Sequence, residues 1–175
     1  LGAGAILGVL LAGRFADRLL ARGRVSGRML VAGSAFALTA VMIVPTAGLR
    51  PLALAAPLLF LVAAGLGGSN PPLDAARLDI MIAPLWGRAE SVRTALRSLF
   101  VAAAPLLFGL VSVAFAGGGS PFNSTGGTGA AGLNLTFLVM AVSLVLAAVI
   151  LLIPARKAYP ADVATAAAAE HESAA

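Results

Sequence analysis

The long uncharged apolar runs constrain this chain more than any other feature of its sequence. Residues 29–49 and 51–73 carry no charged side chain, and residues 98–155 form one uncharged stretch. A helix needs roughly 20 apolar residues to cross a bilayer core about 30 Å thick. The first two runs each have this length, and the third has room for two crossings. A cluster of glycine, serine, proline and asparagine at residues 117–132 predicts a loop that divides it.

These runs predict an all-α membrane protein, a polytopic helical bundle. Each run is continuously apolar rather than alternating, which favours helices over the strands of a barrel. The expected bundle covers residues 1–157 with about five helices, at 1–16, 29–47, 52–74, 97–116 and 133–153. Because the chain opens inside an apolar run, we expect the first span to lack its start. The Ala-rich residues 158–175 bury little apolar surface and are predicted to form a disordered cytoplasmic tail.

The distribution of cations predicts the orientation of the bundle. Eleven of the 12 lysine and arginine residues lie in the loops on one side of the predicted membrane, and only Arg50 lies on the other. Cytoplasmic loops carry such an excess, so the C-terminus is predicted to be cytoplasmic, in the cell inner (plasma) membrane. These cations sit at the ends of apolar runs, a pattern of membrane topology rather than of a phosphate-binding face, so we expect the lipid bilayer as partner and no nucleic acid.

The polar residues of the chain exclude most catalytic chemistry. The chain has no cysteine, and its single histidine, His171, lies in the predicted tail. The apolar runs contain no paired carboxylates, and the sequence has no phosphate-binding loop of the Walker type. We therefore expect no catalytic residues, no metal and no cofactor. An enzyme embedded in the membrane is the weakest of the functional interpretations.

The loop after the first run contains an acid among arginines. It reads GRFADR at residues 13–18, and Gly23-Arg24 follow. An acid at the C-terminal end of a helix opposes the helix dipole, unless it faces a cation or the start of another helix. One interpretation is therefore a specific contact of Asp17. The other is a basic loop that only sets the topology.

This loop resembles a signature of the major facilitator superfamily, in which Gly, three residues and Asp-Arg precede Gly-Arg. The matching residues are Gly13, Asp17, Arg18, Gly23 and Arg24. Three additional residues separate the two halves of the signature, as in its looser second copy. The segment APLWGRAES at residues 83–91 is similar to the family's link between helices ten and eleven. The resemblance implies part of the C-terminal six-helix half of a 12-helix transporter, from helix 8 to helix 12.

The resemblance also implies a conformational latch. Asp17 would face the span that begins near Arg97, with Arg93 or Arg97 as its partner. Such contacts hold the cytoplasmic side closed and break during transport. Replacement of Asp17 by asparagine is therefore expected to impair cycling without abolishing folding.

Polar residues near the end of the third span form a second candidate site. Asn70, Asp74 and Arg77 lie at i, i+4 and i+7, on one helical face. Pro71 and Pro72 are expected to kink or open the helix beside them. One interpretation is the lining of a cavity or its gate. The other is a helix end, where Asp74 and Arg77 form an i, i+3 ion pair at the headgroups.

The expected function is secondary active transport of a small solute by alternating access. The partners implied are the bilayer, the missing N-terminal half of the same transporter and a small-molecule substrate. The alternative is a non-transporting membrane scaffold or a truncated remnant. The glycines and alanines at residues 4, 8, 12, 65 and 68 are expected to pack helices closely rather than to bind substrate.

Overall fold

The computed structural model describes residues 1–49, 51–115 and 128–174, and within these ranges the chain is helical without strands. The main helices are α1 (Gly2–Ala21), α2 (Gly27–Gly48), α3 (Leu52–Asp79), α4 (Trp86–Phe115), α5 (Thr128–Ile150) and α6 (Arg156–Ala174). A short 3-10 turn, Ala83–Leu85, precedes α4. A π-helical segment, Leu151–Ala155, joins α5 to α6 and contains Pro154, which cannot donate a backbone hydrogen bond.

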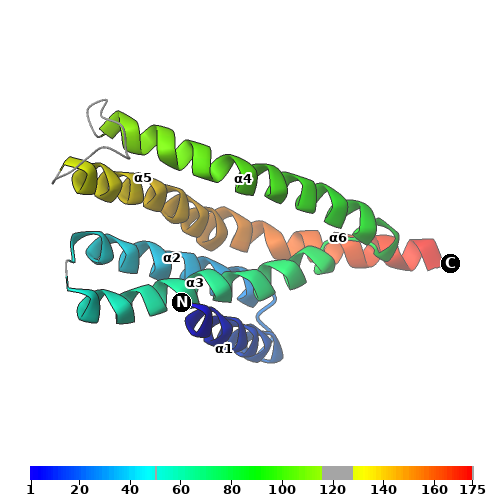
Figure 1. Ribbon diagram of the computed structural model, residues 1–175. Helices are drawn as coiled ribbons and strands as arrows, with labels where there is room; N and C mark the ends of the chain where they lie inside the picture. Colours follow the sequence, from blue (N-terminus) through cyan, green and yellow to red (C-terminus); the bar gives the residue numbers. More distant parts are fainter. Residues whose placement is uncertain (50, 116–127, 175) are drawn as a thin grey trace.

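The helices pack side by side in the order α1, α3, α2, α5, α4 (Figure 1). The arrangement is an open row rather than a closed bundle, so the two outer helices, α1 and α4, each leave one side uncovered. The window of α4 that is long enough to cross a membrane is only 6% buried, against 33% for those of α2 and α3. The row therefore has a packed centre, α2 and α3, and a loosely held edge, α4.

Four helical segments of the described residues are long and apolar enough to cross a membrane. They are Gly27–Thr46, Ala53–Asp79, Trp86–Ala114 and Leu135–His171. These segments confirm the all-helical fold class and match the last four predicted spans. The first predicted span, 1–16, lies in α1, which is 20 residues long but is not among them. Its second half carries Arg14, Asp17 and Arg18, so the apolar part is too short.

Two helix boundaries differ from the predicted ones. Helix α3 continues to Asp79 through Pro71 and Pro72, where the sequence predicted a kinked or opened helix and an end at residue 74. Pro72 is fully buried against its neighbours, so packing holds the helix together despite the lost donor. Helix α4 begins at Trp86, whereas the predicted span begins at residue 97. The prediction counted only the apolar residues that fit a bilayer, and the helix also includes the charged turns before them.

The sequence predicted a disordered tail at residues 158–175, and this prediction is corrected by the structure. Residues 158–174 belong to helix α6. Alanine is the strongest helix former, and seven of the 12 residues from Ala158 to Ala169 are alanines. Tyr159 is only 3% exposed and packs against Met29 and Ala76. This buried contact anchors the start of the helix, which composition alone did not reveal.

Small residues bring α1 into close contact with α3. The buried residues of α1 are Gly4, Gly8, Ala12 and Ala16, spaced four apart on one face. A Cβ atom built on Gly4 would lie 2.5 Å from the backbone oxygen of Phe60, and one on Gly8 would overlap the backbone of Ala64. The predicted small-residue packing is therefore confirmed for α1.

Candidate functional site: two ionic clusters at the basic end

Most of the charged residues gather at one end of the helical row. The ends of α1 and α3 meet the starts of α2, α4 and α6 there, on the right in Figure 1. We call this region the basic end, since eleven of the 12 cations of the chain belong to these segments. Helices α3 and α4 converge at this end and diverge toward the other (Figure 1).

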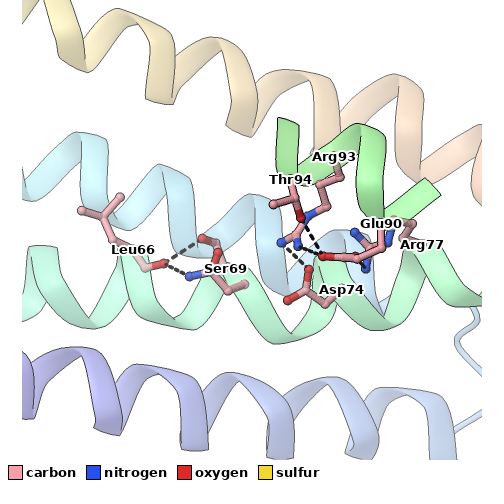
Figure 2. A network of polar contacts seen from close by, with 8 residues as sticks. Leu66, Ser69, Asp74, Arg77, Glu90, Arg93 and Thr94 are labelled. Carbon is pink, nitrogen blue, oxygen red and sulfur yellow. Dashed lines mark hydrogen bonds and ion pairs between the residues drawn. The ribbon is translucent and has the colours of Figure 1, made fainter. Parts of the chain in front are cut away.

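Two ion pairs join the end of α3 to the start of α4. The Arg93 Nη2 atom lies 2.6 Å from Asp74 Oδ1, and the Arg77 Nη2 atom lies 2.5 Å from Glu90 Oε2. Figure 2 shows the side chains of α4 reaching across to those of α3. Each helix contributes one acid and one base, so the pairs cross in opposite directions and fix the register of the two helices.

Glu90 connects the two pairs into one network. Its Oε1 atom accepts hydrogen bonds from Arg93 Nη1 at 3.1 Å and from Thr94 Oγ1 at 3.3 Å (Figure 2). We call these residues the α3–α4 network: Asp74, Arg77, Glu90, Arg93 and Thr94. The side chains of its four charged members are 21–46% exposed. Water reaches Asp74, Glu90 and Arg93, so each ion pair contributes little stability, whereas Arg77 is the least exposed member and its Nη1 atom is buried without a hydrogen-bond partner.

A second cluster ties α3 to α2 and α6. The Arg28 guanidinium pairs with Asp79, and its Nη1 atom also donates to the backbone oxygen of Ala75 at 3.1 Å. The Tyr159 hydroxyl donates to Asp79 Oδ2 at 2.5 Å. We call Arg28, Asp79 and Tyr159 the Asp79 cluster. The Asp79 carboxylate accepts hydrogen bonds from Arg28 of α2 and from Tyr159 of α6. It therefore holds the starts of both helices against the end of α3.

Tyr159→Phe is expected to lower the free energy of unfolding by about 1.5 kcal/mol, because Asp79 loses a charge-assisted hydrogen bond. The measurement is thermal unfolding of the full-length protein in detergent. Thr165→Ala serves as control, since Thr165 is exposed on the same helix and bonds only within it, to Ala161. Equal stability of the two variants would show that Tyr159 does not anchor α6.

The predicted gate residues are placed together, but they do not pair as expected. The prediction of an i, i+3 ion pair between Asp74 and Arg77 is wrong. Asp74 pairs with Arg93 and Arg77 pairs with Glu90, both on α4. The neighbouring helix offers opposite charges at shorter range than the same helix does. Pro71 is half-buried within α3, and the exposed Asn70 donates to the backbone oxygen of Leu66 at 3.4 Å.

The predicted latch residues are not brought together in this structure. Asp17 is exposed and makes no ion pair within the described residues, whereas Arg93 is held by Asp74 and Glu90. Arg18, Arg24 and Arg97 are exposed as well. Gly13 has open space beside it, and Gly23 has a φ of 74°, so it forms the left-handed turn that ends α1. The latch of Asp17 stays a prediction.

Sequence reasoning missed five residues of the two clusters: Arg28, Asp79, Glu90, Thr94 and Tyr159. A signal for three of them was present. Only four of the seven acids lie before residue 158, at positions 17, 74, 79 and 90, and all belong to the basic end. Acids among many cations at the boundary of a membrane are candidates for ion pairs. No comparable pattern marks Tyr159, whose partner is 80 residues away.

An apolar cavity lies in the half of the row away from the basic end. Its volume is about 910 Å³, and its walls come from the start of α1, the end of α2 and the first two thirds of α3. Thr46 and Asn70 are the polar side chains among its lining residues, and Phe137 of α5 completes the wall. The cavity thus has mostly aliphatic walls with two uncharged hydrogen-bonding groups.

Neither metal ligands nor known relatives add to this description. In the described part of the chain, no group of three or more His, Cys, Asp or Glu side chains is placed to hold a metal ion. Comparison with protein families, with characterised proteins and with solved structures finds no match to this chain. The two ionic clusters and the cavity are therefore the features from which function is inferred.

Proposed function

We propose that this chain is part of a secondary active transporter of the major facilitator type, corresponding to helices 8 to 12 in its C-terminal half. It would move a small solute by alternating access. One observation carries the proposal: ion pairs join α3 to α4 at the basic end, while the apolar cavity lies in the opposite half. Alternating access needs a site that is closed on one side and accessible on the other.

The chemistry of the α3–α4 network suits a contact that opens and closes. The side chains of Asp74, Glu90 and Arg93 are 34–46% exposed, so water can replace their partners when the pairs break. Two crossed pairs still define one closed position, because both must align together. The glycine contacts between α1 and α3 are different, since separating them would open a gap between backbones.

The packing of α4 supports movement of this helix. Helix α4 packs along α5, and its spanning segment is only 6% buried. It meets α3 through the α3–α4 network and the short connection that ends with the turn Ala83–Leu85. Loss of the two ion pairs would therefore release α4 from α3 without disrupting the packed centre of the row.

The cavity favours a hydrophobic or amphipathic solute as substrate. Aliphatic walls exclude a strongly hydrated ion, because it would lose its water without gaining charged partners. The side chains of Thr46 and Asn70 supply hydrogen bonds that can orient a polar group. The cavity begins beside Leu1, so the expected start of the first span, together with the N-terminal half of the transporter, would supply the remaining walls. The excess of cations favours a plasma membrane location with the basic end and the C-terminus in the cytoplasm.

Cross-linking α3 to α4 tests the proposal. These 175 residues contain no cysteine, so Asp74→Cys with Arg93→Cys introduces the only cysteine pair of this segment, and any cysteine elsewhere in the full-length protein is first replaced by serine. After reaction with a short bifunctional thiol reagent, we expect the full-length protein in liposomes to lose at least about 90% of its ethidium or other amphipathic dye flux, because a gate must open in every cycle. A cleavable reagent restores flux on reduction.

The matched control places two cysteines on one helix. Lys157→Cys with Ala161→Cys lies on the exposed surface of α6, outside both clusters, and its cross-link should leave flux unchanged. If dye flux continues after α3 and α4 are cross-linked, the α3–α4 network is not a gate. No flux of any solute in a broad panel, with or without a proton gradient, would favour the non-transporting scaffold.

A further inference from the structure

One face of α1 changes from leucine to arginine along its length. Leu7, Leu11, Arg14 and Arg18 lie at i, i+4, i+7 and i+11, so they form one stripe along the helix. Leu7 is 47% exposed and Leu11 is 51% exposed. The buried glycines and alanines of α1 face α3 and lie about a third of a turn around the helix from this stripe. We call these four residues the α1 stripe.

The arginines near the α1 stripe differ from those in the two clusters. Arg28, Arg77 and Arg93 each pair with a carboxylate. The arginines of the α1 end and the following turn are exposed and have no ion pair within the described ranges: Arg14, Arg18, Arg22 and Arg24. Asp17 is the one acid between Leu1 and Arg28, so this segment has a clear positive excess. These exposed arginines are therefore available to an anion from outside the described chain.

We propose that the α1 stripe binds an anionic phospholipid. Leu7 and Leu11 would contact the acyl chains, and Arg14 and Arg18 would hold the phosphate. Arginine suits this role because its guanidinium forms paired hydrogen bonds with phosphate oxygens. The Arg18 guanidinium also lies 6.0 Å from the ring centre of Phe15, an exposed aromatic beside the stripe.

The order of residues along the stripe distinguishes a lipid from other anions. In a leaflet, hydrocarbon gives way to phosphate within a few ångströms, and the stripe changes from Leu11 to Arg14 within one helical turn. A free phosphate would use the arginines but not the leucines. Juxtamembrane clusters of arginine attract anionic lipids in this way. The inference depends on the membrane location of the chain and not on transport.

Lipid titration of the full-length protein tests the proposal. The protein is purified in an uncharged detergent, and binding of phosphatidylglycerol is followed by native mass spectrometry, with phosphatidylcholine as the neutral comparison. Each arginine near an anionic surface contributes about fivefold in affinity, so Arg14→Gln with Arg18→Gln should weaken phosphatidylglycerol binding roughly 25-fold. Phosphatidylcholine binding should not change.

Two further variants keep the result specific. Arg88→Gln with Lys157→Gln removes the same charge from exposed sites on two other helices at the basic end and should change the affinity less than about twofold. Arg14→Lys with Arg18→Lys retains the charge and should keep most of the binding. Helical content by circular dichroism confirms that each variant is folded.

Three outcomes would overturn the lipid site. The first is equal phosphatidylglycerol affinity in the Arg14/Arg18 variant and the Arg88/Lys157 control. The second is equal binding of phosphatidylcholine by the unaltered protein. The third is full competition by glycerol phosphate, which has the charged group but no acyl chains and would show a site for soluble anions.

Discussion

Gly8→Leu is expected to lower the free energy of unfolding by about 3 kcal/mol, one of the two largest effects of a single substitution in this chain. A Cβ atom on Gly8 would already overlap the backbone of Ala64, which cannot rotate away as a side chain can. The larger side chain therefore has to push α1 away from α3. The gap would also loosen the neighbouring contacts of Gly4 with Phe60 and of Gly67 with Ala5.

The matched control is Gly13→Leu on the same helix. A Cβ atom on Gly13 meets no atom within 4 Å, and the position is helical. Replacing a helical glycine with leucine favours the helix by several tenths of a kcal/mol, so this variant should be as stable as the original or slightly more so. Each variant is purified in a mild detergent and titrated with a denaturing detergent, which gives its free energy of unfolding. Equal stability of the two variants would show that α1 does not pack on α3 through Gly8.

Asp79→Ala is expected to lower the free energy of unfolding by about 2 to 3 kcal/mol, because it breaks two contacts of the Asp79 cluster together. The Arg28 guanidinium would keep only the backbone oxygen of Ala75, and the Tyr159 hydroxyl would lose its acceptor. The side chain of Arg28 is only 19% exposed, so water compensates the lost charge incompletely. The starts of α2 and α6 would both lose their attachment to α3.

Asp17→Asn is the control for this loss of a carboxylate. Asp17 is exposed and unpaired in the described structure, so its replacement should change stability by less than about 0.5 kcal/mol. Thermal unfolding of both variants in the same detergent compares them. A double-mutant cycle with Arg28→Gln isolates the ion pair itself. Equal effects of the Asp79 and Asp17 variants would contradict the Asp79 cluster as a structural anchor.

The large losses of stability expected for Gly8→Leu and Asp79→Ala mark contacts that stay formed, in contrast to the reversible α3–α4 network. Gly8 and the Asp79 cluster hold α1, α2, α3 and α6 together, through close backbone contact and through partly buried charge. The α3–α4 network is more exposed and holds only one edge of the row. A transporter of the proposed kind needs both properties, a rigid group of helices and a contact that breaks in each cycle.

Part of the candidate site was predictable from the sequence. Asp74 and Arg77 were singled out because charges near apolar runs are costly and need partners, and Arg93 because the family resemblance implied a latch with Asp17. Their pairing was not predictable, since each of them has acceptable partners both on its own helix and on neighbours. Glu90 decides the outcome by offering Arg77 a carboxylate from α4. Tyr159 illustrates the limit, because its contact with Asp79 depends on where α6 lies.

The sequence by itself determined the helical class, the four segments that are long and apolar enough to cross a membrane, and the gathering of cations at one end. These properties depend on the length and polarity of local runs, which the bilayer dimension turns into helices. Tertiary structure alone decided the order of the helices in the row, the continuation of α3 to Asp79, the ordered α6 and the choice of ionic partners. Each of these depends on contacts between residues far apart in the chain, whose distances no local pattern encodes.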